Sequence, residues 1–306
     1  MPTADDPQLP AGYLPRIHRA QVTAVRQLTP GLVRVTLGGP DLTDYPTTGI
    51  GDEYVRLFFP DTPDSEPRLP HVTDRGWEWD EGVEPAAMRV YTVRHHRAGE
   101  VDLDFVVHEG GIAAAWAQQV AVGQVVGLNA PYGLYDPPAG TTRQVLVADE
   151  PALPAALRIA EATADRVATT LLLEVRGSEH QLQARVPDGA AVEHVWLRGS
   201  GNGHSPSHLV EALRRTEVTD TTYVWVASET RENRAARRYL RHDLGLPGDR
   251  YKCVGYWTER AEEWRERYDA LGPDFSERLD ALWADETRDT EEIVDEVQRL
   301  YEAVGL

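Results

Sequence analysis

The sequence predicts two folded domains and an appendage: a six-stranded antiparallel β-barrel, a doubly wound parallel α/β sheet, and a helical extension. Residues 16–136 contain short alternating segments separated by turns, as antiparallel strands do. From residue 143, continuous apolar runs alternate with helical segments, which is typical of parallel strands buried on both faces. After residue 258, acidic residues dominate and apolar residues recur at helical spacing. The expected units are a leader over 1–15, the barrel over 16–138, the α/β domain over 139–258 and the extension over 259–306.

The composition is that of an ordinary globular protein and excludes several classes. The 306 residues are enough to bury a sizeable core. A net charge of −19 makes nucleic acids and anionic membranes poor partners. The single cysteine, Cys253, excludes an intrachain disulfide and an iron–sulfur cluster held by this chain alone. No apolar stretch reaches the roughly 18 residues of a membrane span, and the acidic start does not match a signal peptide. We therefore expect a cytoplasmic protein without membrane insertion, and a monomer.

Six strands and one short helix are expected in the barrel. The strands are 17–27, 32–39, 52–60, 88–96, 101–108 and 124–129, and the helix is 110–119. Proline, glycine and charged residues fill 61–85, which predicts a long loop. The DPPAG segment at 136–140 is a plausible linker to the second domain.

The α/β domain is expected to alternate strands and helices. The strands are 143–148, 168–177, 190–199, 222–228 and 251–257, and the helices are 151–163, 207–216 and 229–245. The extension from 259 carries 16 acids and 6 arginines, a net charge of −10. Its apolar stripe is expected to dock it as a helical appendage with a solvated outer face. The stripe consists of Ile293, Val294, Val297, Leu300, Tyr301 and Val304.

The sharpest motif is the strand segment 89–94, RVYTVR. Alternation along a strand places Arg89 and Tyr91 on one face. An arginine there suits bidentate contact with a phosphate, and a tyrosine offers a flat surface for stacking. The Thr92 hydroxyl and backbone are placed to hydrogen-bond the edge of a ring. The alternative is an edge strand with ordinary exposed side chains.

The second motif is the segment 108–117, HEGGIAAAWA. A glycine pair before a helix lets backbone N–H groups approach an anion, and the small residues leave room for a phosphate or ribose. The alternative is a tight turn with a core tryptophan.

The third motif is the pair Asp149 and Glu150 at the end of the first α/β strand. Two carboxylates at a helix start stabilise the helix by capping, but they repel a pyrophosphate, and no G-x-G-x-x-G pattern occurs at this turn. The glycine-rich segment 199–205 matches no phosphate-loop pattern and is interpreted as a flexible loop. His95 and His96 are adjacent and point to opposite faces of a strand, so no metal site is expected.

With these motifs in this order, the chain resembles the siderophore-interacting protein family, flavin-dependent ferric-siderophore reductases related to the ferredoxin–NADP reductase superfamily. The residues that match the family pattern are Arg89, Tyr91, Thr92, Arg94, His108, Gly111, Ala113, Trp116, Ala117, 148–150, 152–155, Trp225, Ala227, Glu229 and 255–257. The chain departs from the pattern at Glu109, Ile112, Pro151, Ser228 and 258–260, which alters the second turn and part of the substrate pocket.

The resemblance implies that FAD lies along the barrel. Arg89 would hold the diphosphate, Tyr91 would stack on the isoalloxazine, and Thr92 would bond its central ring. The turn Gly111–Ala114 would receive the diphosphate or the adenosine. The full implied cofactor set is Arg89, Val90, Tyr91, Thr92, His108, Gly111, Ile112, Ala113, Ala114 and Trp116. The implied substrate set is Arg56, Lys252, Arg260 and Trp257.

The function that this resemblance implies is FAD-dependent reduction of ferric siderophores, with release of Fe(II) and electrons from NADPH or NADH. No side chain is needed as an acid or a base. A reductase with another acceptor, ferredoxin as the donor, and a non-catalytic siderophore-binding flavoprotein are the alternatives.

Overall fold

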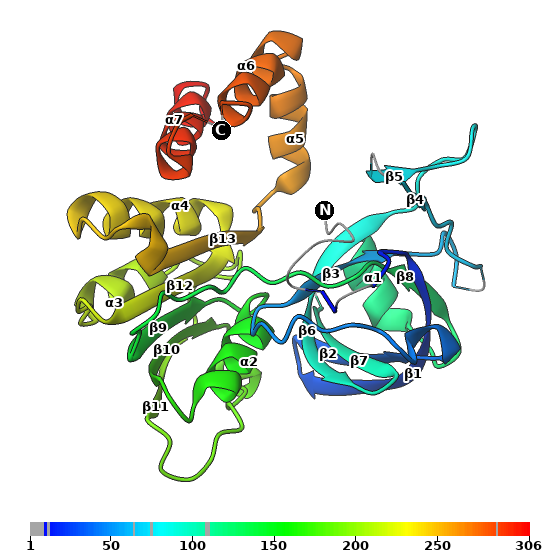
Figure 1. Ribbon diagram of the computed structural model, residues 1–306, viewed down its shortest axis with the longest axis horizontal. Helices are drawn as coiled ribbons and strands as arrows, with labels where there is room; N and C mark the ends of the chain where they lie inside the picture. The colour runs from blue at the N-terminus through cyan, green and yellow to red at the C-terminus, as the bar shows by residue number, and fades with distance from the viewer. Residues whose placement is uncertain (1–8, 11–12, 64, 74–75, 108–110, 286) are drawn as a thin grey trace.

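A closed barrel of six antiparallel strands forms the first domain of the computed structural model, which describes residues 9–10, 13–63, 65–73, 76–107, 111–285 and 287–306 (Figure 1). Around the barrel the strands are β1 (His18–Thr29), β2 (Leu32–Gly38), β7 (Glu100–Val106), β6 (Met88–Arg97), β3 (Tyr54–Phe58) and β8 (Val125–Leu128). Alternate residues of these strands point inward and form one apolar core. The six predicted strands are therefore confirmed.

Helix α1 (Ile112–Gln119) packs against β2 and β7 and adds Trp116 to the barrel core. A short 3-10 helix, η1 (Pro40–Leu42), follows β2. The stretch predicted as a long loop contains a small hairpin of β4 (His71–Thr73) and β5 (Gly76–Glu78), which stands away from the α/β domain in Figure 1. Alternating polar residues hide this hairpin in the sequence, and Trp77 packs on Phe58, with ring centroids 5.2 Å apart.

The second domain is a five-stranded parallel sheet, which confirms the predicted doubly wound class. Its strand order is β11 (Val192–Arg198), β10 (Ala168–Val175), β9 (Arg143–Ala148), β12 (Thr222–Glu229) and β13 (Tyr251–Trp257). The chain starts at the central strand and winds first to one edge and then to the other, so the order reverses between β9 and β12. Ligands of such sheets bind at the carboxyl ends of the strands near this reversal.

Helices cover both faces of the sheet. On the face toward the barrel lies α2 (Leu153–Thr163), and on the other face lie α3 (Leu209–Arg215) and α4 (Thr230–Arg238). Short helical turns complete the connections: η2 (Ser178–His180), η3 (Tyr239–Asp243) and η4 (Gly248–Arg250). No helix of the described chain is long and apolar enough to cross a bilayer.

The extension consists of α5 (Ala261–Asp269), α6 (Pro273–Trp283) and α7 (Thr290–Ala303). Most of the predicted stripe packs within the extension, where Ile293 and Val297 contact α6 in a small separate core. Tyr301 of the stripe also reaches α4, where the Arg234 guanidinium lies 5.3 Å from its ring. Ion pairs attach the tail as well: buried Arg237 of α4 contacts Glu291 at 2.6 Å and Asp295 at 2.5 Å. Much of the acidic charge on α7 thus faces arginines of the α/β domain.

Candidate functional site between the barrel and the sheet

Strand alternation divides the segment 89–94 of β6 between two faces. Tyr91 turns toward the barrel core, where its ring lies 4.2 Å from that of Phe105. Thr92 turns outward, and its hydroxyl lies 3.4 Å from the hydroxyl of Tyr256 on β13. Burial raises the pKa of Tyr91 and of Tyr256, so both hydroxyls stay protonated. The strand therefore offers a ring platform on one side and a polar contact with the second domain on the other.

The first half of β6 also has a backbone edge outside the barrel ladder. The Val93 N–H donates to the Glu53 carbonyl at the β3 side, 2.8 Å away. Because backbone groups alternate along a strand, the N–H groups of Val90 and Thr92 point away from β3. On that side β7 pairs with β6 only from Val93 onward, within the described chain. This edge is suited to hydrogen bonds with the rim of a flat heterocycle.

The start of α1 is open to an anion. Gly111 precedes it with a φ of 80°, which favours glycine, and neither a side-chain cap nor an acid occupies its first turn. Ala113 and Ala114 are buried and small, whereas Ile112 is half exposed. The N–H groups of this turn and the helix dipole favour a phosphate there. His108 lies outside the described residues.

Aromatic contacts bring the β6 motif and α1 together. The Trp116 ring centroid lies 5.4 Å from that of Phe105, which in turn contacts Tyr91. The buried Trp116 Nε1 has no hydrogen-bond partner in the described chain. Arg89 is exposed, donates to the Met88 carbonyl at 2.7 Å, and pairs with no described carboxylate. This region thus combines the Tyr91 ring, the open backbone edge of β6, the uncapped start of α1 and an arginine that pairs with no described carboxylate. These features fit FAD.

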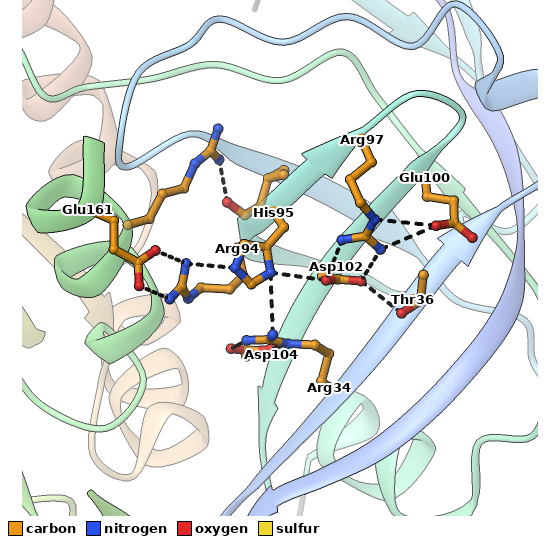
Figure 2. Close-up of polar contacts among 11 residues, drawn as sticks. Arg34, Thr36, Arg94, His95, Arg97, Glu100, Asp102, Asp104 and Glu161 are labelled. Atoms are coloured by element: carbon orange, nitrogen blue, oxygen red, sulfur yellow. Dashed lines mark hydrogen bonds and ion pairs between the residues drawn. The ribbon is translucent and has the colours of Figure 1, made fainter. Parts of the chain in front are cut away.

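A polar network joins this strand to the second domain (Figure 2). Arg94 of β6 donates two hydrogen bonds to Glu161 of α2, at 2.7 and 2.6 Å. The same guanidinium lies 3.1 Å from the His95 ring, which reaches Asp102 at 3.0 Å. Burial raises the pKa of Glu161, but the hydrogen bonds and the charge of Arg94 outweigh it, so the pKa is lowered. Arg94, a match to the family motif, is thus a link between domains.

Two further contacts fix the domains to each other. Buried Asp52, just before β3, accepts hydrogen bonds from the Trp225 indole at 3.0 Å and from the Leu134 and Tyr135 N–H groups. Burial raises the pKa of Asp52, and these three donors oppose that rise. Arg158 of α2 reaches buried Glu53 at 3.3 Å. Strand β12 and helix α2 of the second domain are therefore joined directly to the start of β3.

Two of the four predicted substrate residues border the same stretch of chain. Arg56 lies opposite Val90 in the ladder, and its guanidinium lies 5.9 Å from the Tyr54 ring and 5.5 Å from the Trp77 ring. Burial raises the pKa of the Tyr54 hydroxyl, and the positive charge of Arg56 opposes that rise. Lys252 lies on the barrel-facing side of β13. Burial raises the pKa of Asp52, and the positive charge of Lys252 is among the effects that oppose the rise.

The other two predicted substrate residues lie elsewhere. Arg260 has a left-handed φ of 52° before α5, and its exposed side chain pairs with Glu263 at 3.4 Å. Trp257 lies at the carboxyl edge of the sheet, where its Nε1 donates to Asp149 at 2.7 Å. Arg56 and Lys252 therefore both influence the segment Asp52–Tyr54, whereas Arg260 and Trp257 contact residues elsewhere.

Asp149 ties together three elements at the carboxyl edge. Besides the Trp257 indole, its carboxyl accepts the Glu229 N–H at 2.9 Å and the Ala152 N–H at 3.4 Å. Burial raises its pKa from 3.8 to about 7, against the effect of these donors. The carboxylate that the sequence placed here as a helix cap also orients Trp257.

The free energy of unfolding of the Asp149→Asn variant is expected to depend less on pH than that of the wild type. Between pH 4 and 7 the folded protein keeps a proton that the unfolded chain has lost, so the free energy of unfolding falls as pH rises. Removing this group should flatten the dependence by up to about 1.4 kcal/mol per pH unit in that window. Urea unfolding from pH 5 to 8 measures this, with Asp220→Asn as an exposed control. Parallel curves for Asp149→Asn and wild type would contradict the assignment.

The sequence interpretation missed the residues that join the domains. Tyr256 appeared only within a family pattern, although strand alternation places it on the same face as Lys252. Asp52 and Glu161 carry no local signal, because their partners lie 173 and 67 residues away.

Comparisons with known proteins agree with this architecture. The family model described as "Siderophore-interacting FAD-binding domain" matches residues 21–135, and that described as "Siderophore-interacting protein" matches residues 141–260. The crystal structure of a siderophore utilization protein from T. fusca superposes with a TM-score of 0.70 at 31% identity, over 81% of this chain and 95% of that one.

Two curated relatives have named activities. The NADPH-dependent ferric-chelate reductase of Escherichia coli is 28% identical over 247 residues, 79% of this chain and 93% of that protein. The ferric vibriobactin reductase ViuB of Vibrio cholerae is 28% identical over 246 residues, 78% of this chain and 88% of that protein.

Proposed function

The chain belongs to the siderophore-interacting protein family, and we propose that it is an FAD-dependent reductase of ferric siderophores. One observation carries the proposal most directly. The outward face of β6, where Thr92 meets Tyr256, borders Arg56 in the neighbouring strand. A flavin-fitting edge, a contact with the second domain and a cation thus share one boundary. The named relatives reduce ferric chelates, which agrees with such a site.

The side chains bind and orient rather than transfer protons. FAD supplies the chemistry when bound, because it accepts two electrons from a nicotinamide and releases them singly. Arg89 and the start of α1 hold the diphosphate, Tyr91 supports the ring, and the Val90–Thr92 edge bonds its rim. His108, Ile112, Ala113, Ala114 and Trp116 complete the proposed cofactor set. Tyr256, partly buried, contacts Thr92 through its hydroxyl and Trp225 through its ring, and so closes this edge on the side of the second domain.

Arg56 and Lys252 are proposed to attract an anionic ferric chelate to the barrel–sheet boundary. Ferrous iron fits hard oxygen ligands less well than ferric iron, so reduction favours release of the metal. The Trp77 ring beside Arg56 adds an apolar surface for an aromatic part of the chelate. Arg260 and Trp257 belong to this set only if the chelate extends toward α5 and the carboxyl edge.

The proposal also covers the electron donor and the setting of the reaction. A nicotinamide dinucleotide is the proposed donor, with reduced ferredoxin as the alternative that the test below separates. We propose that the protein works as a monomer in the cytoplasm, where nicotinamide donors are present.

Removing the two cations is expected to weaken use of an anionic ferric siderophore. Arg56→Gln and Lys252→Gln should each lower kcat/KM for the chelate about tenfold, because each removes one attractive charge. Flavin bleaching by the nicotinamide should stay unchanged in both variants. The assay traps Fe(II) with a chromogenic chelator under nitrogen, with Arg265→Gln on exposed α5 as the matched control. Unchanged kinetics with several anionic ferric siderophores would overturn the substrate assignment.

A further inference from the structure

Backbone donors at the carboxyl edge of the sheet are already taken by the chain's own carboxylates. Glu229 accepts the Arg231 N–H at 2.5 Å and so caps α4. Asp149 accepts the Ala152 N–H before α2, and buried Glu174 accepts the His208 N–H at 2.6 Å. Phosphates of a dinucleotide commonly use such N–H groups. At this edge a phosphate meets negative charge instead.

A cavity of about 370 Å³ opens at this edge. Its wall includes Glu229, Glu232, Glu259, Arg231, His204 and Trp257. Three carboxylates therefore face one arginine. Burial raises the pKa of Glu232, the charges of Glu174 and Glu229 add to the rise, and the charge of Arg231 opposes it.

The carboxylates differ in how far they are engaged. Both carboxylate oxygens of Glu229 accept hydrogen bonds within the chain, because the second oxygen accepts the Glu259 N–H at 3.1 Å. Glu232 is half buried and has no ion-pair partner in the described part of the chain. Arg176, beside the neighbouring cavity, is paired with Glu150 at 3.0 Å. Arg231 is thus the arginine left among the described wall residues, and one cation cannot balance both the diphosphate that NADH and NADPH share and a further 2′-phosphate.

The two dinucleotides differ by one phosphate on the adenosine ribose. A carboxylate accepts hydrogen bonds from a free ribose diol, whereas an extra arginine is needed to accommodate a 2′-phosphate. We propose that this chain takes NADH in preference to NADPH, because Glu232 and Glu259 line the cavity in which the adenosine ribose would lie. The inference rests on the proposed function and concerns its donor. It assigns Glu232 as a residue that determines donor specificity.

Binding of fragments tests the inference without turnover. Calorimetry on the FAD-loaded protein compares ADP-ribose with 2′-phospho-ADP-ribose, which lack a reducible nicotinamide. ADP-ribose should bind about tenfold or more tightly, and the difference should shrink as salt screens the carboxylates. Equal or tighter binding of the phosphorylated fragment overturns the proposal, as does binding of neither.

Substitution of Glu232 tests the residue itself. Glu232→Arg should shift the ratio of flavin-bleaching rates, NADH over NADPH, about tenfold or more toward NADPH. Glu232→Gln should shift it less in the same direction and keeps the size of the side chain. Glu193→Arg, at the amino end of β11 and exposed, is the control. An unchanged ratio in both Glu232 variants overturns the assignment. Fragments that bind as expected while neither dinucleotide bleaches the flavin would instead contradict the proposed function.

Discussion

Replacing Tyr91 by alanine is expected to weaken FAD binding about 30- to 100-fold, equivalent to about 2–3 kcal/mol of lost stacking. The Tyr91 ring centroid lies 4.2 Å from that of Phe105, which holds the partly buried ring in place, and we expect the ring to support the isoalloxazine. The variant should lose flavin during purification. Fluorescence titration of the apoprotein with FAD gives the affinity.

Tyr91→Phe is the matched variant, because it keeps the ring and removes only the hydroxyl. It should retain FAD to within a few-fold of wild type, and thermal melting shows whether each variant is folded. Full FAD occupancy and an unaltered flavin spectrum in Tyr91→Ala would show that the ring does not support the cofactor.

Breaking the link between Arg94 and Glu161 is expected to cost about 3 kcal/mol of unfolding free energy, because Arg94→Gln leaves a half-buried carboxylate without its cation. The Arg94 side chain is only 4% exposed and that of Glu161 16%. Reduction of the flavin by a nicotinamide should also slow, since Thr92 and Tyr256 lose the brace that holds their strands together. Urea unfolding and rapid mixing measure the two effects.

A double-mutant cycle separates the interaction energy of Arg94 and Glu161 from the effect of losing each residue alone. The Arg94→Gln/Glu161→Gln double variant should lose less stability than the sum of the two single variants, because neither partner is left charged and buried. Arg166→Gln, in an exposed pair with Asp165, should cost less than about 0.5 kcal/mol. Additive losses in the cycle would mean that the two residues do not act through each other.

The fold was largely predictable because it rests on local periodicity. Alternation in the six barrel strands and buried runs in β9 to β13 each follow from a few neighbouring residues. The β4–β5 hairpin was missed because its polar, proline-rich surroundings resemble a loop. The docking of the tail was only partly predicted, because apolar residues look the same in sequence whether they face α6, as Ile293 and Val297 do, or also reach α4, as Tyr301 does.

The candidate site was predictable where one strand or one turn builds it. Arg89 to Thr92 and the turn at Gly111 are each continuous in sequence, and their roles toward FAD, which the family resemblance implies, stay predictions. The roles of the other motif residues depend on which face of β6 they occupy. Arg94, two residues after Thr92, lies on the outward face and pairs with Glu161 of the second domain. Trp257 was grouped with Arg56 and Lys252, yet its bond to Asp149 holds it at the carboxyl edge. Such pairings depend on where two domains meet, which local patterns do not contain.

The most direct test of the central claim follows the bound flavin through both half-reactions without oxygen. The purified protein is expected to show a flavin spectrum that NADH bleaches, and a ferric siderophore should then restore it as a ferrous trap records Fe(II). Bleaching only by dithionite or reduced ferredoxin would move the donor to a protein partner. A reduced flavin that a ferric siderophore leaves unchanged, or a folded protein that binds no FAD, would contradict the account.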